Sequence, residues 1–238
     1  MTNEQITHDV DTNDAWIQAR TGIQTRGVAS DQETLVELSA GAASKAIATS
    51  GIDPQSIDLT VVATSSNPVA MPGIAPPLVD KLGLTSGAFD LAAACAGFSY
   101  SLSIAADAVR SGSARNVLVV GAERLTDITD PTDRNTCYLF GDGAGAAVVS
   151  ATDVDEDEIG PVVWGSEGAL AEHISVPVGG QYLRMDGQAV FKWAITKVAD
   201  IAREACERAG VETSELAAFV PHQANLRIIE SIARSLKL

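Results

Sequence analysis

Cysteine is scarce in this sequence, and the cysteines it has are far apart. The 238 residues include three, at positions 95, 137 and 206. Small extracellular folds that depend on disulfides carry many closely spaced cysteines. The sequence therefore predicts no disulfide framework, and it favours a protein of the reducing cytoplasm.

Basic residues and long apolar runs are also lacking. The chain has 16 Lys and Arg against 31 Asp and Glu, which gives a formal net charge of −15. A nucleic-acid-binding surface needs a basic patch, so nucleic acid is excluded as a partner. No stretch approaches the roughly 18 apolar residues of a membrane helix, and the N-terminus has no basic and apolar regions typical of a signal peptide. We therefore expect no membrane partner.

Metal-binding patterns are missing as well. The sequence has no CxxC or HExxH motif and no cluster of carboxylates with metal-ligand spacing. The acidic run at residues 153–158 lacks the glycine and the terminal glutamate of a calcium loop. It is predicted to be a solvated loop, and no metal site is expected.

Among the residues that are present, Cys95 is placed most informatively. It ends an apolar run at residues 88–95 that predicts a buried strand, and an amphipathic helix is predicted for residues 97–109. The free N–H groups at a helix N-terminus favour negative charge, so a thiol there is expected to have a lowered pKa and a larger fraction of nucleophilic thiolate. The alternative is a small buried core cysteine. This segment alone does not decide between them.

His222 follows a second short apolar segment, which predicts a strand over residues 218–222. Ligand-binding and catalytic groups collect at the carboxyl ends of strands in α/β sheets. A single histidine is more often structural than catalytic. A lone cysteine and a distant histidine at equivalent strand ends are nevertheless what thiol-based acyl transfer needs.

The chain also resembles itself at an offset of 159 residues. Residues 50–59 align with residues 209–218, and an alanine-rich helix, 34–49 or 188–208, precedes each copy. Gly51 and Gly210 are predicted to end these helices, and a short strand is predicted to follow each. Chance similarity between helix-turn-strand units is the alternative. Duplication predicts two related halves, residues 1–160 with Cys95 and residues 161–238 with His222, the second half incomplete.

Five motifs, in this order and spacing, resemble β-ketoacyl-acyl carrier protein synthase III, a condensing enzyme of the thiolase-like superfamily. They occupy residues 16–23 (WIQARTGI), 92–98 (AAACAGF), 130–134 (DPTDR), 140–146 (FGDGAGA) and 221–225 (PHQAN). The resemblance implies a five-layered αβαβα core from two related halves, with a mixed five-stranded sheet ending at Cys95. It implies a decarboxylating Claisen condensation that starts type II fatty-acid synthesis.

The resemblance also implies the partners and the roles of individual residues. An acyl-CoA primer would acylate Cys95, and malonyl-acyl carrier protein would lose CO2 and attack the acyl thioester. His222 would donate a hydrogen bond to the developing oxyanion. The CoA thioester is a substrate, and no metal or redox cofactor is required. The implied CoA and pantetheine contacts are Trp16, Arg20, Thr21, Arg134, Gly187, Phe191 and Asn225.

Further expectations concern the surface. Met71 would help close the acyl pocket across the interface of a homodimer. Because acyl carrier proteins are acidic, docking needs a local basic patch, predicted at Lys192, Arg227 and Arg234. The glycine-rich residues 141–145 precede a strand and not a helix, so a tight turn is expected there, not a dinucleotide site. Cys137, in a strand-like run, and Cys206, on a helix face, are expected to be structural.

The sequence departs from the family in three places. It has no match to the family's glycine-punctuated first strand, and residues 176–181 form a shorter segment than usual. The family's catalytic asparagine lies in a Gly-Asn-Thr-Ser segment beyond the matched region, and Asn225 is not that residue. Two alternatives therefore stay open: an acyltransferase of the same fold that does not condense, and an inactive fragment or scaffold.

Overall fold

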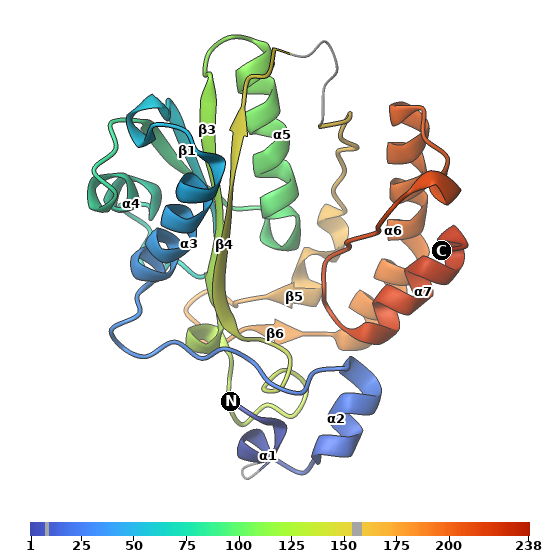
Figure 1. Ribbon diagram of the computed structural model, residues 1–238. Coiled ribbons are helices and arrows are strands. Elements are labelled where there is room, and N and C mark those ends of the chain that lie inside the picture. Colours follow the sequence, from blue (N-terminus) through green and yellow to red (C-terminus); the bar gives the residue numbers. More distant parts are fainter. Residues whose placement is uncertain (8–9, 154–158) are drawn as a thin grey trace. The chain divides into compact units, whose positions relative to one another are not determined.

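A computed structural model describes residues 1–7, 10–153 and 159–238 (Figure 1). The chain forms two compact units. The sheet unit contains residues 27–125 and 141–159, and the helical unit contains residues 1–26, 126–140 and 160–238. The predicted division at residue 160 into two related halves is a different partition and stays a prediction. Most of the acidic run at 153–158 lies outside the described residues.

The sheet unit is built on four strands in the order β2-β1-β3-β4. Their bounds are β1 Leu59–Ala63, β2 Gly87–Leu91, β3 Asn116–Arg124 and β4 Asp142–Ser150. The first three are parallel, and β4 runs antiparallel to β3. Parallel neighbours need long crossovers, which here contain α4 (Ala75–Lys81) and α5 (Gly97–Arg110). The carboxyl ends of β1, β2 and β3 therefore lie along one edge of the sheet.

Helices cover both faces of this sheet (Figure 1). Val62, Leu118 and Val120 pack on one face with α4 and with α3 (Leu35–Ser50). Val61, Val117 and Val119 pack on the other face with α5. Strands covered on both sides are expected to be largely apolar, as β1 and the Val117–Val120 part of β3 are. The unit is thus an α/β/α sandwich.

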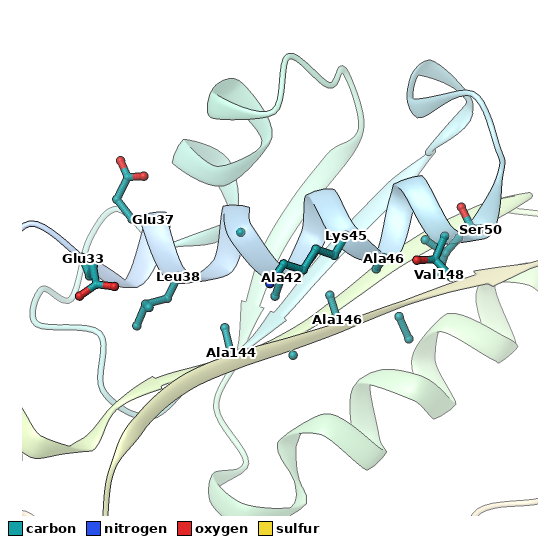
Figure 2. Close-up of a pocket in the computed structure, with 14 residues that line it drawn as sticks. Glu33, Glu37, Leu38, Ala42, Lys45, Ala46, Ser50, Ala144, Ala146 and Val148 are labelled. Atoms are coloured by element: carbon teal, nitrogen blue, oxygen red, sulfur yellow. The ribbon is translucent and has the colours of Figure 1, made fainter. Parts of the chain in front are cut away.

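The resemblance implies five strands, whereas the described residues form four in this sheet. In the described part of the chain no strand pairs with the outer edge of β4. A groove of about 900 Å3 lies there between β4 and α3, lined by Leu38, Ala42 and the small residues Ala144–Ala147 (Figure 2). None of the predicted site residues lines this groove.

The helical unit contains α1 (Asn3–Ile6), α2 (Asp14–Thr21), α6 (Gly187–Ala209) and α7 (Leu226–Leu236). A two-stranded sheet pairs β5 (Ile174–Ser175) with β6 (Arg184–Met185). Helices α6 and α7 share a core in which Ala194, Ala199, Ile228, Ile232 and Leu236 are buried. No helix in the described ranges is long and apolar enough to cross a bilayer.

The structure supports the internal repeat in part. Gly51 (φ 72°) and Gly210 (φ 67°) end α3 and α6 in the left-handed conformation, as predicted. The 3-10 turns Pro54–Ser56 and Thr213–Glu215 follow them at the same offset of 159. The first copy then continues into β1. Residues 218–222 form no strand, contrary to prediction, because an extended segment needs a hydrogen-bonded neighbour and no described strand pairs with it.

We predict that Gly97→Ala destabilises the sheet unit. A Cβ at Gly97 would lie 3.1 Å from the Cβ of Ala63, which is fixed to the backbone of β1 and cannot rotate away. We expect the free energy of unfolding to fall by about 1–2 kcal/mol in chemical denaturation, as for other overpacked sites. Gly41→Ala is the matched control: no atom lies within 4 Å of its Cβ, so it should stabilise α3 by about 0.5–1 kcal/mol. If the two variants changed the free energy of unfolding equally, the short distance from Gly97 to Ala63 would not be the cause.

Candidate active site

Cys95 lies on a sharp connection between β2 and α5. Strand β2 ends at Leu91, four residues earlier than predicted, and Cys95 occupies a 3-10 turn, Ala94–Ala96, before α5 begins. Ala94 has a φ of 44°, a left-handed conformation that costs a residue with a Cβ about 1 kcal/mol. Such strain is concentrated at functional sites. The turn leaves part of Cys95 exposed although protein packs around its sulfur, so Cys95 is not a fully buried core cysteine.

The thiol of Cys95 does not have the lowered pKa that the sequence predicted. Protein packed around the sulfur raises its pKa, and the negative charge of Glu123 raises it further. A hydrogen bond to the residue's own backbone opposes these effects only in part. The expectation was wrong because Cys95 precedes the first residue of α5 by two positions, and because a carboxylate on β3 has no signature in the local sequence.

His222 lies in the extended segment between the turn at Thr213–Glu215 and α7, and it is exposed. Partial burial of its ring lowers the imidazole pKa below its ordinary value. The neutral form therefore dominates at pH 7, and a neutral imidazole can donate one N–H without carrying charge. Cys95 belongs to the sheet unit and His222 to the helical unit.

A cationic aromatic cluster surrounds Trp16 in the helical unit. The guanidinium carbons of Arg20 and Arg134 lie 4.6 and 5.3 Å from the centroid of the indole ring. Tyr138 packs edge-on against the same ring, with centroids 5.5 Å apart. Arg134 is further fixed by its Nε, which donates to the carbonyl of Asp11 at 2.6 Å. The cluster offers π surface and two positive charges, which suit an adenine nucleotide with its phosphates.

Sequence reasoning missed the residues that hold this cluster. Arg26 donates from one Nη to the carbonyl of Tyr138 at 2.9 Å and to Asn3 Oδ1 at 2.8 Å. The bond to Tyr138 spans 112 positions and the bond to Asn3 spans 23, so no local pattern could indicate them. Arg26 and Tyr138 are therefore structural supports for the indole platform that only the fold shows.

The remaining predicted substrate contacts have local structural roles. Thr21 is buried, and its hydroxyl donates to the Ile17 carbonyl at 2.7 Å. Asn225 caps α7, where its Oδ1 accepts from the backbone N–H of Ile228 at 3.0 Å. Gly187 begins α6, and Phe191 lies one turn further along it. These observations leave their roles in substrate binding as predictions.

Met71 lies in a loop before α4 and is 85% exposed. The carboxylate of Asp90, on edge strand β2, accepts the backbone N–H groups of Ile74 and Ala75, each at 2.7 Å. This anchors the end of the loop to β2. The role of Met71 in an acyl pocket that a second subunit completes stays a prediction.

The predicted docking residues lie on α6 and α7, and all three are exposed. The guanidinium of Arg227 lies 5.9 Å from the ring centroid of Phe191, and Arg234 pairs loosely with Glu230 at 3.9 Å. Lys192 directly follows Phe191 on α6. The structure thus places Arg227 against Phe191 of α6, and docking of a carrier protein at these three residues stays a prediction.

Two minor predictions were wrong about local structure. Cys137 is buried in a turn and not in a strand-like run, while Cys206 lies on α6 as expected. Residues 142–145 form the start of β4 rather than a tight turn. Asp142 connects the start of β4 to the segment around Gly27. Its carboxylate accepts a hydrogen bond from the Ala29 N–H at 2.8 Å, and its own N–H donates to the Gly27 carbonyl at 2.9 Å.

Family models and curated relatives match this chain as the sequence motifs predicted. Residues 89–168 match the family model of 3-oxoacyl-[acyl-carrier-protein (ACP)] synthase III, and residues 206–238 match the model of its C-terminal part. β-Ketoacyl-[acyl-carrier-protein] synthase III of Streptomyces glaucescens is 45% identical over 99% of this chain and 74% of its own length. Synthase III 4 of Streptomyces coelicolor is 46% identical over 98% of this chain and 74% of its own length.

Solved structures agree with these relatives. The priming β-ketosynthase of the R1128 polyketide pathway has a TM-score of 0.96 and 45% identity, and the match covers all of this chain and 74% of that one. The synthase III of Aquifex aeolicus has a TM-score of 0.96 and 39% identity, covering all of this chain and 77% of that one. The predicted thiolase-like fold class is confirmed, and the chain belongs to the β-ketoacyl-[acyl-carrier-protein] synthase III family.

Proposed function

We propose that Cys95 is the nucleophile and His222 an oxyanion donor in the condensation of an acyl-CoA primer with malonyl-acyl carrier protein. Family membership supports condensation over simple acyl transfer. The observation that carries the assignment of Cys95 is its exposure on a strained turn at the carboxyl edge of parallel strands. Of the three cysteines, Cys137 is buried and Cys206 lies partly buried on a helix.

The proposed reaction has two half-reactions. The Cys95 thiolate attacks the thioester carbonyl of acyl-CoA, and CoA leaves as its thiolate, which gives an acyl-Cys95 thioester. Malonyl-acyl carrier protein then loses CO2, and the electrons of the broken bond form an enolate. The enolate carbon attacks the acyl carbonyl, and Cys95 leaves as a thiolate. Because decarboxylation supplies the carbanion, the reaction uses CoA thioester as a substrate and needs no further cofactor.

His222 is proposed to stabilise the enolate oxygen. Negative charge develops there as CO2 departs, and a positioned N–H donor lowers the energy of that state. The lowered pKa of His222 supports this role, because the ring is neutral at pH 7 and its N–H is available. The backbone N–H of Cys95 is proposed to stabilise the oxyanion of the first half-reaction.

Location, assembly and pathway are also proposals. Three cysteines without disulfides support a reducing cytoplasm. Strand β2 is paired on one side only among the described residues, and Phe89 on it is 39% exposed, which supports a homodimer through this edge. Type II fatty-acid synthesis is the main candidate pathway. Priming of polyketide synthesis is the second, because the R1128 priming ketosynthase is 45% identical to this chain.

The primer series tests this function. Formation of β-ketoacyl-acyl carrier protein from malonyl-acyl carrier protein should be followed with acetyl-, isobutyryl- and longer acyl-CoA. Turnover with at least one primer is expected, and its chain length separates the candidate pathways. Cys95 acylation without any condensed product would favour the acyltransferase alternative instead.

We predict that Trp16→Ala weakens primer binding. The change removes the ring on which Arg20 and Arg134 are organised. The KM for acyl-CoA in Cys95 acylation should rise about 5- to 30-fold, which corresponds to about 1–2 kcal/mol of stacking and cation–π contacts. Trp164→Ala changes another half-exposed tryptophan and should leave this KM unchanged. An unchanged KM in the Trp16 variant would exclude the indole platform as the CoA site.

We predict that reversing Arg227 and Arg234 to Glu impairs only the second half-reaction. The chain is acidic overall, but residues 181–238 hold 8 basic and 7 acidic groups, so this segment repels an acidic carrier protein least. The KM for malonyl-acyl carrier protein should rise about tenfold or more, and added salt should raise the wild-type KM. Acylation of Cys95 by acyl-CoA should not change. A parallel fall in both half-reactions would contradict docking at α7.

A further inference from the structure

Glu123 is a partly buried carboxylate in the sheet unit that the proposed reaction does not use. It lies one residue before the end of β3, at the same sheet edge as the Cys95 turn. Its Oε1 accepts the backbone N–H of Ser65 at 2.8 Å, and its Oε2 accepts the hydroxyl of Ser66. Thr64 provides a further side-chain hydrogen bond. Because the Glu123 carboxylate accepts several hydrogen bonds, it is held in one position.

These bonds connect the ends of two strands. Thr64, Ser65 and Ser66 directly follow β1, which lies between β2 and β3 in the sheet. Ser66 extends the network, because its Oγ accepts the backbone N–H of Arg124 at 2.8 Å. Glu123 therefore fixes the segment after β1 against the end of β3, beside the connection from β2 that carries Cys95.

The charge of Glu123 also reaches Cys95, where it disfavours the thiolate. Other ionisable groups on the neighbouring elements are Asp90 on β2, Arg124 on β3, and Tyr100, Asp107 and Arg110 on α5. Asp90 is bound to the first N–H groups of α4, and Arg124 donates to the carbonyls of Ser30 and Glu33. In the part of the chain that the structure describes, Glu123 is the charged side chain that acts on the Cys95 thiol.

We propose that Glu123 is a positioning residue of the thiol site: it holds the Thr64–Ser66 segment, whose first N–H donates to the Leu91 carbonyl at the end of β2, and its negative charge at this sheet edge favours the protonated form of the Cys95 thiol. A protonated thiol resists oxidation and adventitious alkylation. Burial raises the pKa of Glu123 itself, so its charge varies closer to neutral pH than that of an exposed glutamate. The proposal rests on the role of Cys95 proposed above.

The test measures the rate of Cys95 alkylation by iodoacetamide against pH, with peptide mass mapping to separate the three cysteines. Glu123→Gln keeps the size and an acceptor oxygen but removes the charge. Its profile should shift to lower pH by about 0.5–1 unit, so alkylation at pH 7 should quicken about 3- to 10-fold. Glu123→Asp, which keeps the charge, should stay near the wild-type profile. Glu37→Gln is the control for net charge, because Glu37 is an exposed carboxylate of the same unit that pairs with Lys81. Its alkylation profile should match that of the wild type.

An unshifted profile in folded Glu123→Gln, or an equal shift in Glu37→Gln, would overturn the proposal. The wild-type protein gives a second test if Glu123→Gln fails to fold. Two coupled groups titrate in two steps, so the logarithm of the alkylation rate should rise with a slope below one where Glu123 ionises. A single step of unit slope would overturn the proposal. Alkylation needs no substrate, so failure here is distinguishable from failure of the proposed condensation.

Discussion

Replacing Cys95 by alanine is expected to abolish acylation by acyl-CoA and to lower condensation turnover by more than roughly a thousandfold. The acyl group must leave CoA before the malonyl-derived carbanion can attack it, and the Cys95 thiol is the nucleophile to which it is transferred. The strained turn at Ala94–Ala96 would remain, because alanine fits where cysteine did. Circular dichroism and thermal unfolding should therefore match the wild type.

Cys206→Ala is the matched control for this change. Cys206 lies partly buried on α6, away from any strand end, so its loss should leave turnover within about twofold of wild type. If the Cys95 variant kept substantial condensation, or if both variants lost it equally, a thiol nucleophile at position 95 would be excluded.

Replacing His222 by alanine is expected to slow condensation about 100- to 1,000-fold, the usual cost of losing one oxyanion donor. Acylation of Cys95 should continue, because the enolate forms only in the second half-reaction. Single-turnover assays that follow acyl-enzyme formation and product formation separately will show the difference. His173→Ala is the control, since His173 lies 3.5 Å from Asp186 near the start of α6 and has no proposed role.

The pH dependence gives an independent check on His222. Its folded pKa lies below the ordinary histidine value, so the neutral ring is the main form at pH 7 and is lost only as pH falls through that lowered pKa. The second half-reaction should therefore show no histidine ionisation between about pH 6.5 and 8. Acylation of Cys95 should instead rise across this range, because the thiol pKa is raised and each step in pH increases the thiolate fraction. If the rate of the second half-reaction fell between pH 8 and pH 6.5 in the way an ordinary histidine titrates, the role of His222 would be contradicted.

Local signals in the sequence identified much of the fold. The glycines that end α3 and α6 were predictable because these helices end in the left-handed conformation, which glycine adopts without strain. The apolar run at residues 88–95 predicted a strand, which forms as β2 over Gly87–Leu91, but this strand lies at the sheet edge and is not buried as expected. Residues 218–222 show the limit of such signals: an apolar segment has strand propensity, but a strand also needs a partner, which a local pattern does not reveal.

The site was predictable to a smaller extent. The motif order indicated Cys95, His222 and the Trp16 cluster, and the structure brings Arg20 and Arg134 to the indole as expected. The direction of the Cys95 pKa was not predictable, because it depends on packing around the sulfur and on Glu123, 28 positions away. Arg26 was not predictable either, because its bond to Tyr138 spans 112 positions.

Intact-mass analysis after incubation with acyl-CoA tests the central claim most directly. We expect a mass increase of one acyl group, lost on treatment with hydroxylamine as a thioester should be, and located on the peptide that contains Cys95. We also expect no label on Cys137 or Cys206. Folded protein that stays unlabelled with every primer, or that carries the acyl group on another residue, would contradict this claim.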